Sequence, residues 1–143
     1  MSRVLAAARA DDPQSGVFLR AARAKVVVVV EADDEARAII VRALSHEYAV
    51  HAAHDAIAAA ERLGVLGTAD LILVSATLPG IDGFTFVRSL RSFAALRSVP
   101  VIFMTPERDA QLLARAIGAG ARQCLTTPIR EAELLRRVHA CVS

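Results

Sequence analysis

The stretch ADLILVSATLPGIDG, which runs from Ala69 to Gly83, decides the fold of this chain. Its first part, Leu71 to Ser75, is a short apolar run of the kind that forms a buried strand. The turn signals Pro79-Gly80 and Asp82-Gly83 lie behind this run. The stretch therefore predicts a buried strand whose carboxyl end leads through a loop into a helix.

Strand and helix patterns alternate on both sides of this stretch. Lys25 to Val30 is a continuous β-branched run, as expected for a strand buried on both faces of a parallel sheet. Further strands are predicted from Tyr48 to Ala52, from Val99 to Thr105 and from Arg122 to Thr126. Apolar residues at helical spacing follow every strand. The five predicted stripes are Ala36, Ile39, Ile40, Ala43 and Leu44; Ala56, Ala59, Ala60 and Leu63; Phe86, Val87 and Leu90; Ala110, Leu113, Ala114 and Ile117; and Leu134, Leu135, Val138 and Val142.

The ends of the predicted helices carry their own signals. The acidic run at residues 33–35 supplies favourable charges for the start of the first helix. Gly64 and Gly67 are predicted to close the second helix. The fourth helix is predicted from about Glu107 to Gly118.

Five strand and helix pairs in alternation predict an α/β fold of the flavodoxin-like, doubly wound class. Its five-stranded parallel sheet is expected in the order 2-1-3-4-5, with right-handed crossovers. The functional crevice of such a sheet lies at the carboxyl ends of the strands. We therefore expect the site at Glu31 and Ala32, Ser75, Thr105 and Thr127.

The charge of the chain is uneven. The 143 residues are enough for one domain with a sizeable core. Residues 1–25 carry five basic and two acidic side chains, whereas the remainder carries twelve basic and thirteen acidic ones. We therefore divide the chain into a basic N-terminal extension, residues 1–24, and a folded domain, residues 25–143. The near-neutral domain argues against a broad nucleic-acid-binding face.

The composition disfavours several classes of protein. No apolar run approaches the roughly 18 to 20 residues of a membrane span, and the N-terminus lacks the apolar region of a secretory signal. A cytoplasmic protein without membrane contact is expected. Cys124 and Cys141 lack redox or zinc spacing and are expected to be reduced packing residues. Without a GxSxG elbow, metal-spaced histidines or a glycine-rich phosphate loop, an enzyme is not expected.

Four segments carry a resemblance to a known family: ADLILVSATLPGIDGF from Ala69, VPVIFMT from Val99, AGA from Ala119 and LTTP from Leu125. Over about residues 25 to 142 the chain resembles the receiver domains of bacterial response regulators, the CheY-like superfamily. The resemblance implies a place in two-component signal transduction or a phosphorelay. It also implies a site at the carboxyl ends of the strands, which is the same edge of the sheet that the strand pattern indicates.

The resemblance implies a particular residue type at each position of that site. This chain has a different residue at three of these positions. In the family the position of Ser75 is the aspartate that accepts a phosphoryl group from a histidine kinase, and serine is a far weaker nucleophile. The acidic pair that holds magnesium aligns with Glu31 and Ala32, so alanine stands where a direct ligand is expected. The lysine that pairs with the phosphoryl oxygens aligns with Thr127. The switch hydroxyl is kept as Thr105.

Neighbouring positions leave some alternatives open. Asp33 could replace the lost metal ligand only with a backbone adjustment, because a helix starts there. Lys25, the only lysine of the chain, precedes the first strand at the opposite edge of the sheet. The peptide bond before Pro128 is cis in the family, but Thr127 could instead cap the last helix with Pro128 at its first position. The family's mobile aromatic residue aligns with Cys124. We expect a degenerate phosphorylation site without a catalytic residue, metal or cofactor.

These positions predict a pseudoreceiver that acts in signalling through phosphorylation-independent protein–protein interaction. Its expected partner is a histidine kinase or another regulator, or a second copy bound through the fourth helix, fifth strand and fifth helix. That face is expected to include Arg115, Arg122, Arg136 and Arg137. The alternatives are a switch controlled by modification of Ser75 or by a small ligand in the vacated pocket, and phosphorylation of another carboxylate.

Overall fold

The computed structural model describes residues 24–106 and 109–142, where one five-stranded parallel sheet forms. The strand order is β2-β1-β3-β4-β5, as predicted. Residues 1–23 of the predicted extension and the predicted helix start at Glu107 lie outside the described residues. The strands are β1 (Val26–Val30), β2 (Ala49–Ala53), β3 (Leu71–Ser75), β4 (Val101–Pro106) and β5 (Gln123–Thr127).

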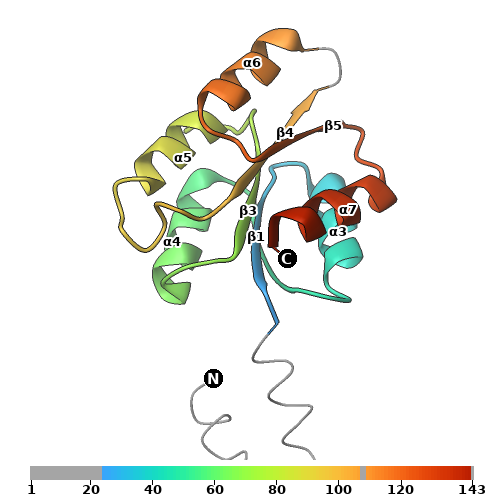
Figure 1. Cartoon of the computed structure of the whole chain (residues 1–143), viewed down its shortest axis with the longest axis horizontal. Helices are drawn as coiled ribbons and strands as arrows, with labels where there is room; N and C mark the ends of the chain where they lie inside the picture. The colour runs from blue at the N-terminus through green and yellow to red at the C-terminus, as the bar shows by residue number, and fades with distance from the viewer. Residues whose placement is uncertain (1–23, 107–108, 143) are drawn as a thin grey trace, which may run out of the picture.

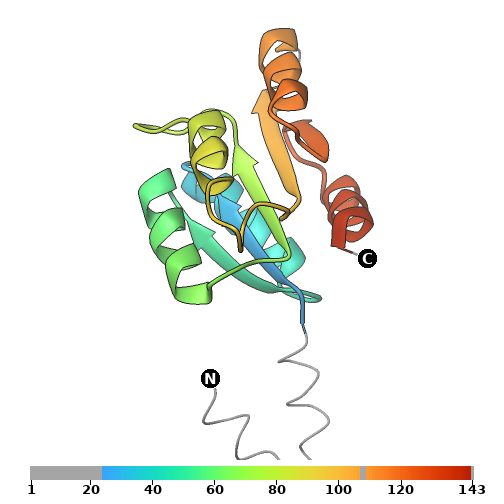
Figure 2. The same ribbon diagram turned by 60° about the vertical axis from the view of Figure 1, so that its left-hand side comes forward.

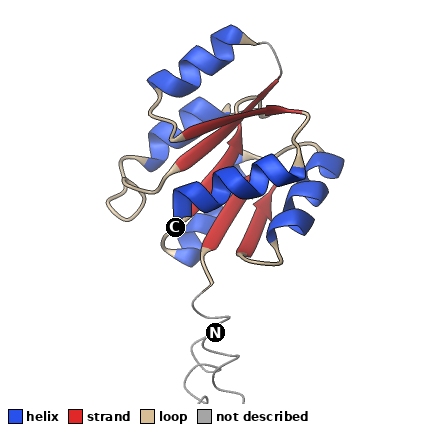
Figure 3. Cartoon of the chain, turned by 45° about the vertical axis from the view of Figure 1, so that its right-hand side comes forward, coloured by secondary structure: helices blue, strands red, loops and turns tan. Residues whose placement is uncertain are grey.

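A helix follows each strand, and the helices cover both faces of the sheet (Figure 1, Figure 3). The core on one face includes residues of α3 and α7, and the core on the other includes residues of α4, α5 and α6. Figure 2 shows α4 and α7 on opposite sides of the sheet. None of the helices in the described ranges is long and apolar enough to cross a membrane. The helices are α3 (Asp34–Leu44), α4 (Ala56–Leu66), α5 (Gly83–Leu90), α6 (Ala110–Gly118) and α7 (Glu131–Val142).

The side chains of β1 alternate between the two cores. Val28 and Val30 belong to the core beneath α4, α5 and α6, whereas Val27 and Val29 belong to the core beneath α3 and α7. All four are fully buried. The alternation arises because successive side chains of a strand point to opposite faces of the sheet. A strand covered on both faces is apolar throughout, which explains the run of valines.

Four helices begin after an aspartate that caps them. The carboxylate of each accepts a hydrogen bond from the backbone amide three residues further on, which satisfies a free donor of the first turn. The capping residues are Asp33, Asp55, Asp82 and Asp109. These four aspartates therefore serve to start the helices that follow β1 to β4.

Several predicted boundaries differ from the structure by a few residues, and two of these differences have identifiable reasons. The strand β2 begins at Ala49 rather than Tyr48, because the Tyr48 amide still donates to the Leu44 carbonyl at the end of α3. Gly64 does not close α4 but lies inside it. Gly67, with φ of 82°, forms the C-cap in the left-handed region that favours glycine.

The predicted apolar stripe of α6 faces the wrong way. Ala110, Leu113, Ala114 and Ile117 are exposed, and Ile117 is 66% exposed. The buried residue of the helix is Ala116. Because α6 is apolar on more than one side, helical periodicity does not determine which side packs on the sheet.

Four arginines were predicted to lie on the face made by α6, β5 and α7, and the structure places one of them elsewhere. The Arg115 guanidinium lies 4.3 Å from the centre of the Phe84 ring, so it faces α5. Arg122 and Arg136 are exposed. Arg137 is half-buried and donates to the side chain of Gln123 at 2.6 Å.

The two cysteines are free thiols, as predicted, and both are half-buried. Cys124 packs against the core beneath α4, α5 and α6, and Cys141 packs against the other core. Burial raises the pKa of both thiols, although nearby arginine charges oppose the rise. They are packing residues rather than activated nucleophiles.

Candidate functional site

Polar side chains gather where the strands end. Glu31, Ser75 and Thr105 are the buried polar or charged residues of the described part of the chain. Each lies at the carboxyl end of β1, β3 or β4. Ala32 follows Glu31, and Thr127 is the last residue of β5. Because parallel strands end at one edge of the sheet, all five predicted positions share that edge.

The Ser75 hydroxyl is held by its own loop. Ser75 is only 6% exposed. Its Oγ donates to the Thr77 carbonyl oxygen at 3.2 Å and accepts from the Thr77 amide at 3.3 Å. No histidine or carboxylate of the described residues hydrogen-bonds to this Oγ. The hydroxyl therefore lacks a described base that would activate it for nucleophilic attack.

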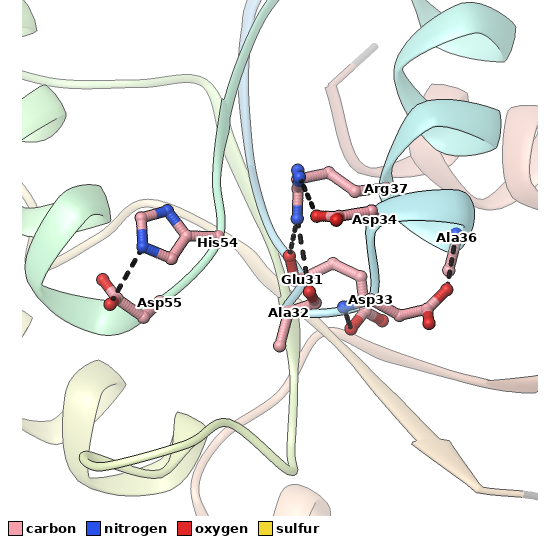
Figure 4. A network of polar contacts seen from close by, with 8 residues as sticks. All are labelled: Glu31, Ala32, Asp33, Asp34, Ala36, Arg37, His54 and Asp55. Atoms are coloured by element: carbon pink, nitrogen blue, oxygen red, sulfur yellow. Dashed lines mark hydrogen bonds and ion pairs between the residues drawn. The ribbon is translucent and has the colours of Figure 1, made fainter.

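The carboxylates after β1 are bound to backbone amides (Figure 4). The Glu31 carboxylate accepts from the Asp33 amide at 3.1 Å. The Asp33 carboxylate in turn accepts from the Ala36 amide at 2.8 Å and caps α3. Both side chains thus stabilise the start of the helix, and Asp33 does not turn back toward the position that Ala32 leaves without a carboxylate.

Arg37, in the first turn of α3, forms hydrogen bonds to the end of β1 (Figure 4). Its guanidinium donates to the carbonyl oxygens of Glu31 at 2.9 Å and Ala32 at 3.4 Å, and it pairs with Asp34 at 2.6 Å. This role of Arg37 is not among the sequence predictions. The three-residue spacing from Asp34 could have indicated the ion pair, but no local pattern indicates the carbonyl contacts.

The two threonines at the end of the sheet differ in their bonding. Thr105 Oγ1 is buried without a hydrogen-bond partner in the described structure. Thr127 Oγ1 donates to the Thr105 backbone carbonyl at 3.4 Å. The Thr127-Pro128 peptide bond is cis, as the resemblance implied. Since α7 begins at Glu131, the alternative in which Thr127 caps that helix is wrong.

The donor atoms at this edge do not fit magnesium. The ion requires near-octahedral oxygen ligands, usually including carboxylates that are free to point at it. One oxygen of each of the Glu31 and Asp33 carboxylates accepts from a backbone amide, and the Ala32 carbonyl accepts from Arg37. Across residues 24–106 and 109–142, no three His, Cys, Asp or Glu side chains form a group that could hold a metal ion.

Two hollows adjoin the site. The first has a volume of about 210 Å³ and lies between α3 and the loop after β5, where Glu31 and Thr127 form part of its lining. The second, of about 160 Å³, lies between β4 and α6 and is lined in part by Thr105 and Thr126. Three of the five predicted positions therefore border open space.

The chain belongs to the response regulator receiver domain family. The sequence model of that family, described as "Response regulator receiver domain", matches residues 27–139. The matched segment includes all five strands apart from Val26. Receiver domains are signalling modules of two-component systems and are generally not enzymes.

Known proteins resemble the chain over most of its length. The two-component response regulator-like protein APRR5 of Arabidopsis thaliana is 34% identical over 110 residues, which is 76% of this chain and 20% of that protein. Response regulator PleD of Caulobacter vibrioides is 30% identical over 120 residues, which is 82% of this chain and 26% of that protein. The chain thus spans about a fifth to a quarter of these curated relatives.

A solved structure shows the same fold. The chemotaxis response regulator CheY4 of Vibrio cholerae superposes with a TM-score of 0.75 at 22% sequence identity. The similarity covers 82% of this chain and 98% of that one. The flavodoxin-like fold predicted from the strand and helix alternation is therefore confirmed.

Proposed function

We propose that this receiver domain signals through protein–protein contacts that do not depend on aspartyl phosphorylation. The observation that carries the proposal is the environment of Ser75, which stands where the family's phosphoryl acceptor is expected. Its hydroxyl is buried, donates a hydrogen bond to the Thr77 carbonyl oxygen and accepts one from the Thr77 amide. A serine held in this way, without a base, is a poor substitute for a free carboxylate.

The positions around Ser75 support the same proposal. Phosphoryl transfer depends largely on positioning and on neutralising charge around the transferred group. Ala32 supplies no carboxylate for a metal, and Thr127 supplies a neutral hydroxyl that is bound to the Thr105 carbonyl. The nucleophile, the metal ligand and the cation of the family are thus absent together, so a change at one position alone would not restore the chemistry.

The proposed contact surface centres on the exposed side of α6. Leu113 and Ile117 lie one turn apart on this helix and are 38% and 66% exposed. Exposed apolar side chains that lie close together are typical of interaction surfaces. Arg122, directly before β5, and Arg136, in α7, are also exposed. The proposed partner is a second copy of the chain, a histidine kinase or another regulator.

Light scattering during gel filtration tests this proposal. We expect the wild-type protein to associate with itself, and its mass to be unchanged by acetyl phosphate and Mg²⁺. Ile117→Glu should reduce the association, whereas Val65→Glu, at a 79% exposed position of α4, should leave it intact. A protein that is monomeric alone and dimeric only after treatment with the phosphodonor contradicts the proposal.

A ligand-controlled switch is the second candidate function. It is favoured by the 210 Å³ hollow beside Glu31 and Thr127 and by the separate 160 Å³ hollow beside Thr105, whose hydroxyl has no described hydrogen-bond partner. The burial of Ser75 argues against its modification by a kinase, because the hydroxyl would first have to be exposed. Native mass spectrometry of protein purified from its own host would detect a bound metabolite. A stoichiometric phosphoserine at position 75 would instead indicate a switch controlled by modification of Ser75.

A further inference from the structure

A larger hollow lies away from this site, between α5 and α6, which are neighbours on the same side of the sheet (Figure 1). It has a volume of about 430 Å³, and three arginines, Arg88, Arg91 and Arg115, line it. None of the five positions of the predicted phosphorylation site contributes to its lining. The other lining residues are Phe84, Val87, Gly118 and Ala119. We propose that this hollow binds a small phosphate-bearing anion.

The first cation is held in a fixed position by the backbone. Arg91 Nη1 donates to the carbonyl oxygens of Leu96 at 3.0 Å, Arg97 at 3.0 Å and Val99 at 2.8 Å. Burial lowers the pKa of this guanidinium, which still remains charged in the physiological range. Its Nε and Nη2 donate to no described residue. A cation that is already ordered loses little side-chain freedom when it binds a ligand.

The second cation is held by an aromatic ring. Arg115 lies over Phe84, and Phe84 in turn stacks on Phe103 with the ring centres 4.8 Å apart. An arginine in the last turn of a helix commonly offsets the negative end of its own helix. Arg115 instead places its charge over the first turn of α5, at the wall of the hollow.

The positive charge of the hollow is not balanced by its lining. No acidic side chain belongs to that lining, and neither Arg88 nor Arg115 forms an ion pair with a described residue. The acidic group that Arg115 influences is Asp82, whose pKa is lowered chiefly by the Thr85 amide and further by the Arg115 charge. The Asp82 carboxylate is already bound to the amide and hydroxyl of Thr85. A concave surface with uncompensated charge of one sign concentrates counter-ions.

The chemistry of the lining indicates the class of ligand. The planar guanidinium group donates paired hydrogen bonds that match the oxygens of a phosphate group. The volume falls within the range of about 300 to 1,000 Å³ that is usual for small-molecule sites. Val87, Gly118 and Ala119 leave room for a small organic part next to the phosphate. A phosphorylated metabolite of about nucleotide size fits these requirements.

Titration of the full chain with inorganic pyrophosphate at low salt tests the proposal, by calorimetry and by amide chemical shifts. We expect saturable binding, with the largest shifts at residues 84–91 and 115–119. The double variant Arg88→Gln/Arg115→Gln should bind at least about tenfold more weakly, because charge-assisted hydrogen bonds are lost. The matched variant Arg42→Gln/Arg62→Gln removes the same charge from α3 and α4 and should change the affinity by less than about twofold.

A second variant separates binding from folding. Ala119→Asp adds a negative charge at an exposed lining position and leaves every arginine and the Phe84 stack in place. It should weaken pyrophosphate binding by a similar factor without changing the circular dichroism spectrum. The proposal is overturned if binding does not saturate, or if the matched control loses as much affinity as the double variant. Shifts spread over all surface arginines would indicate an adventitious ion only and would also overturn it.

Discussion

Gly83, at the start of α5, lies directly against the backbone carbonyl oxygen of Ser75 at the end of β3. A methyl group at Gly83 would come closer to this oxygen than Cβ atoms approach in real proteins. The Gly83 amide also donates to the Ala76 carbonyl at 3.3 Å. This close contact between helix and strand fixes the loop that follows Ser75.

Gly83→Ala is therefore expected to lower the free energy of unfolding by about 1–3 kcal/mol or more, because the backbone has to move to accommodate the methyl group. Gly64→Ala is the matched control, since its position in α4 has nothing within 4 Å of an added Cβ. The control should raise stability by up to about 1 kcal/mol. Urea unfolding measures both, and equal effects of the two changes would contradict the contact.

Thr105→Val is expected to stabilise the fold by about 1 kcal/mol. The valine has nearly the same shape and removes a buried hydroxyl that has no hydrogen-bond partner. Thr126→Val, at an exposed position of β5, should change stability by less than about 0.5 kcal/mol. A clear loss of stability in Thr105→Val, measured by urea unfolding, would show that the hydroxyl is bonded in solution.

The Asp82 cap gives a prediction for pH. Hydrogen bonding to the Thr85 amide holds the pKa of this carboxyl below its ordinary value of 3.8. Because the folded pKa is the lower one, the charged carboxylate stabilises the fold fully above the unfolded value, and this contribution is lost as pH falls through the folded pKa. Asp82→Asn keeps a capping oxygen without the charge. The stability difference between wild type and Asp82→Asn should therefore shrink in acid, and a difference that is constant from neutral to acidic pH contradicts the assignment.

The fold could be predicted because β1 is apolar throughout, β3 is apolar up to Ser75, and both alternate with helical patterns. This pattern is typical of a parallel sheet covered on both faces. The face of α6 could not be predicted. Its sequence offers apolar residues on several sides, and the choice of Ala116 over Ile117 depends on packing against the sheet. Helical periodicity describes a stripe but does not say what covers it.

The candidate site could be located but not described from the sequence. The strand ends placed Ser75, Thr105 and Thr127 at one edge, yet the partner of each hydroxyl is set by loop geometry. The same limit applies to Arg91, whose three carbonyl acceptors lie five to eight residues further along an irregular segment. Such contacts leave no periodic signal in the sequence.

Intact-protein mass spectrometry after incubation with acetyl phosphate and Mg²⁺ tests the central claim most directly. We predict that wild type gains no phosphoryl group, whereas the variant Ala32→Asp/Ser75→Asp/Thr127→Lys gains one. Circular dichroism of both proteins confirms that each is folded under the assay conditions. A hydroxylamine-labile phosphoryl group on the wild-type protein, at Asp33 or any other carboxylate, would contradict the claim.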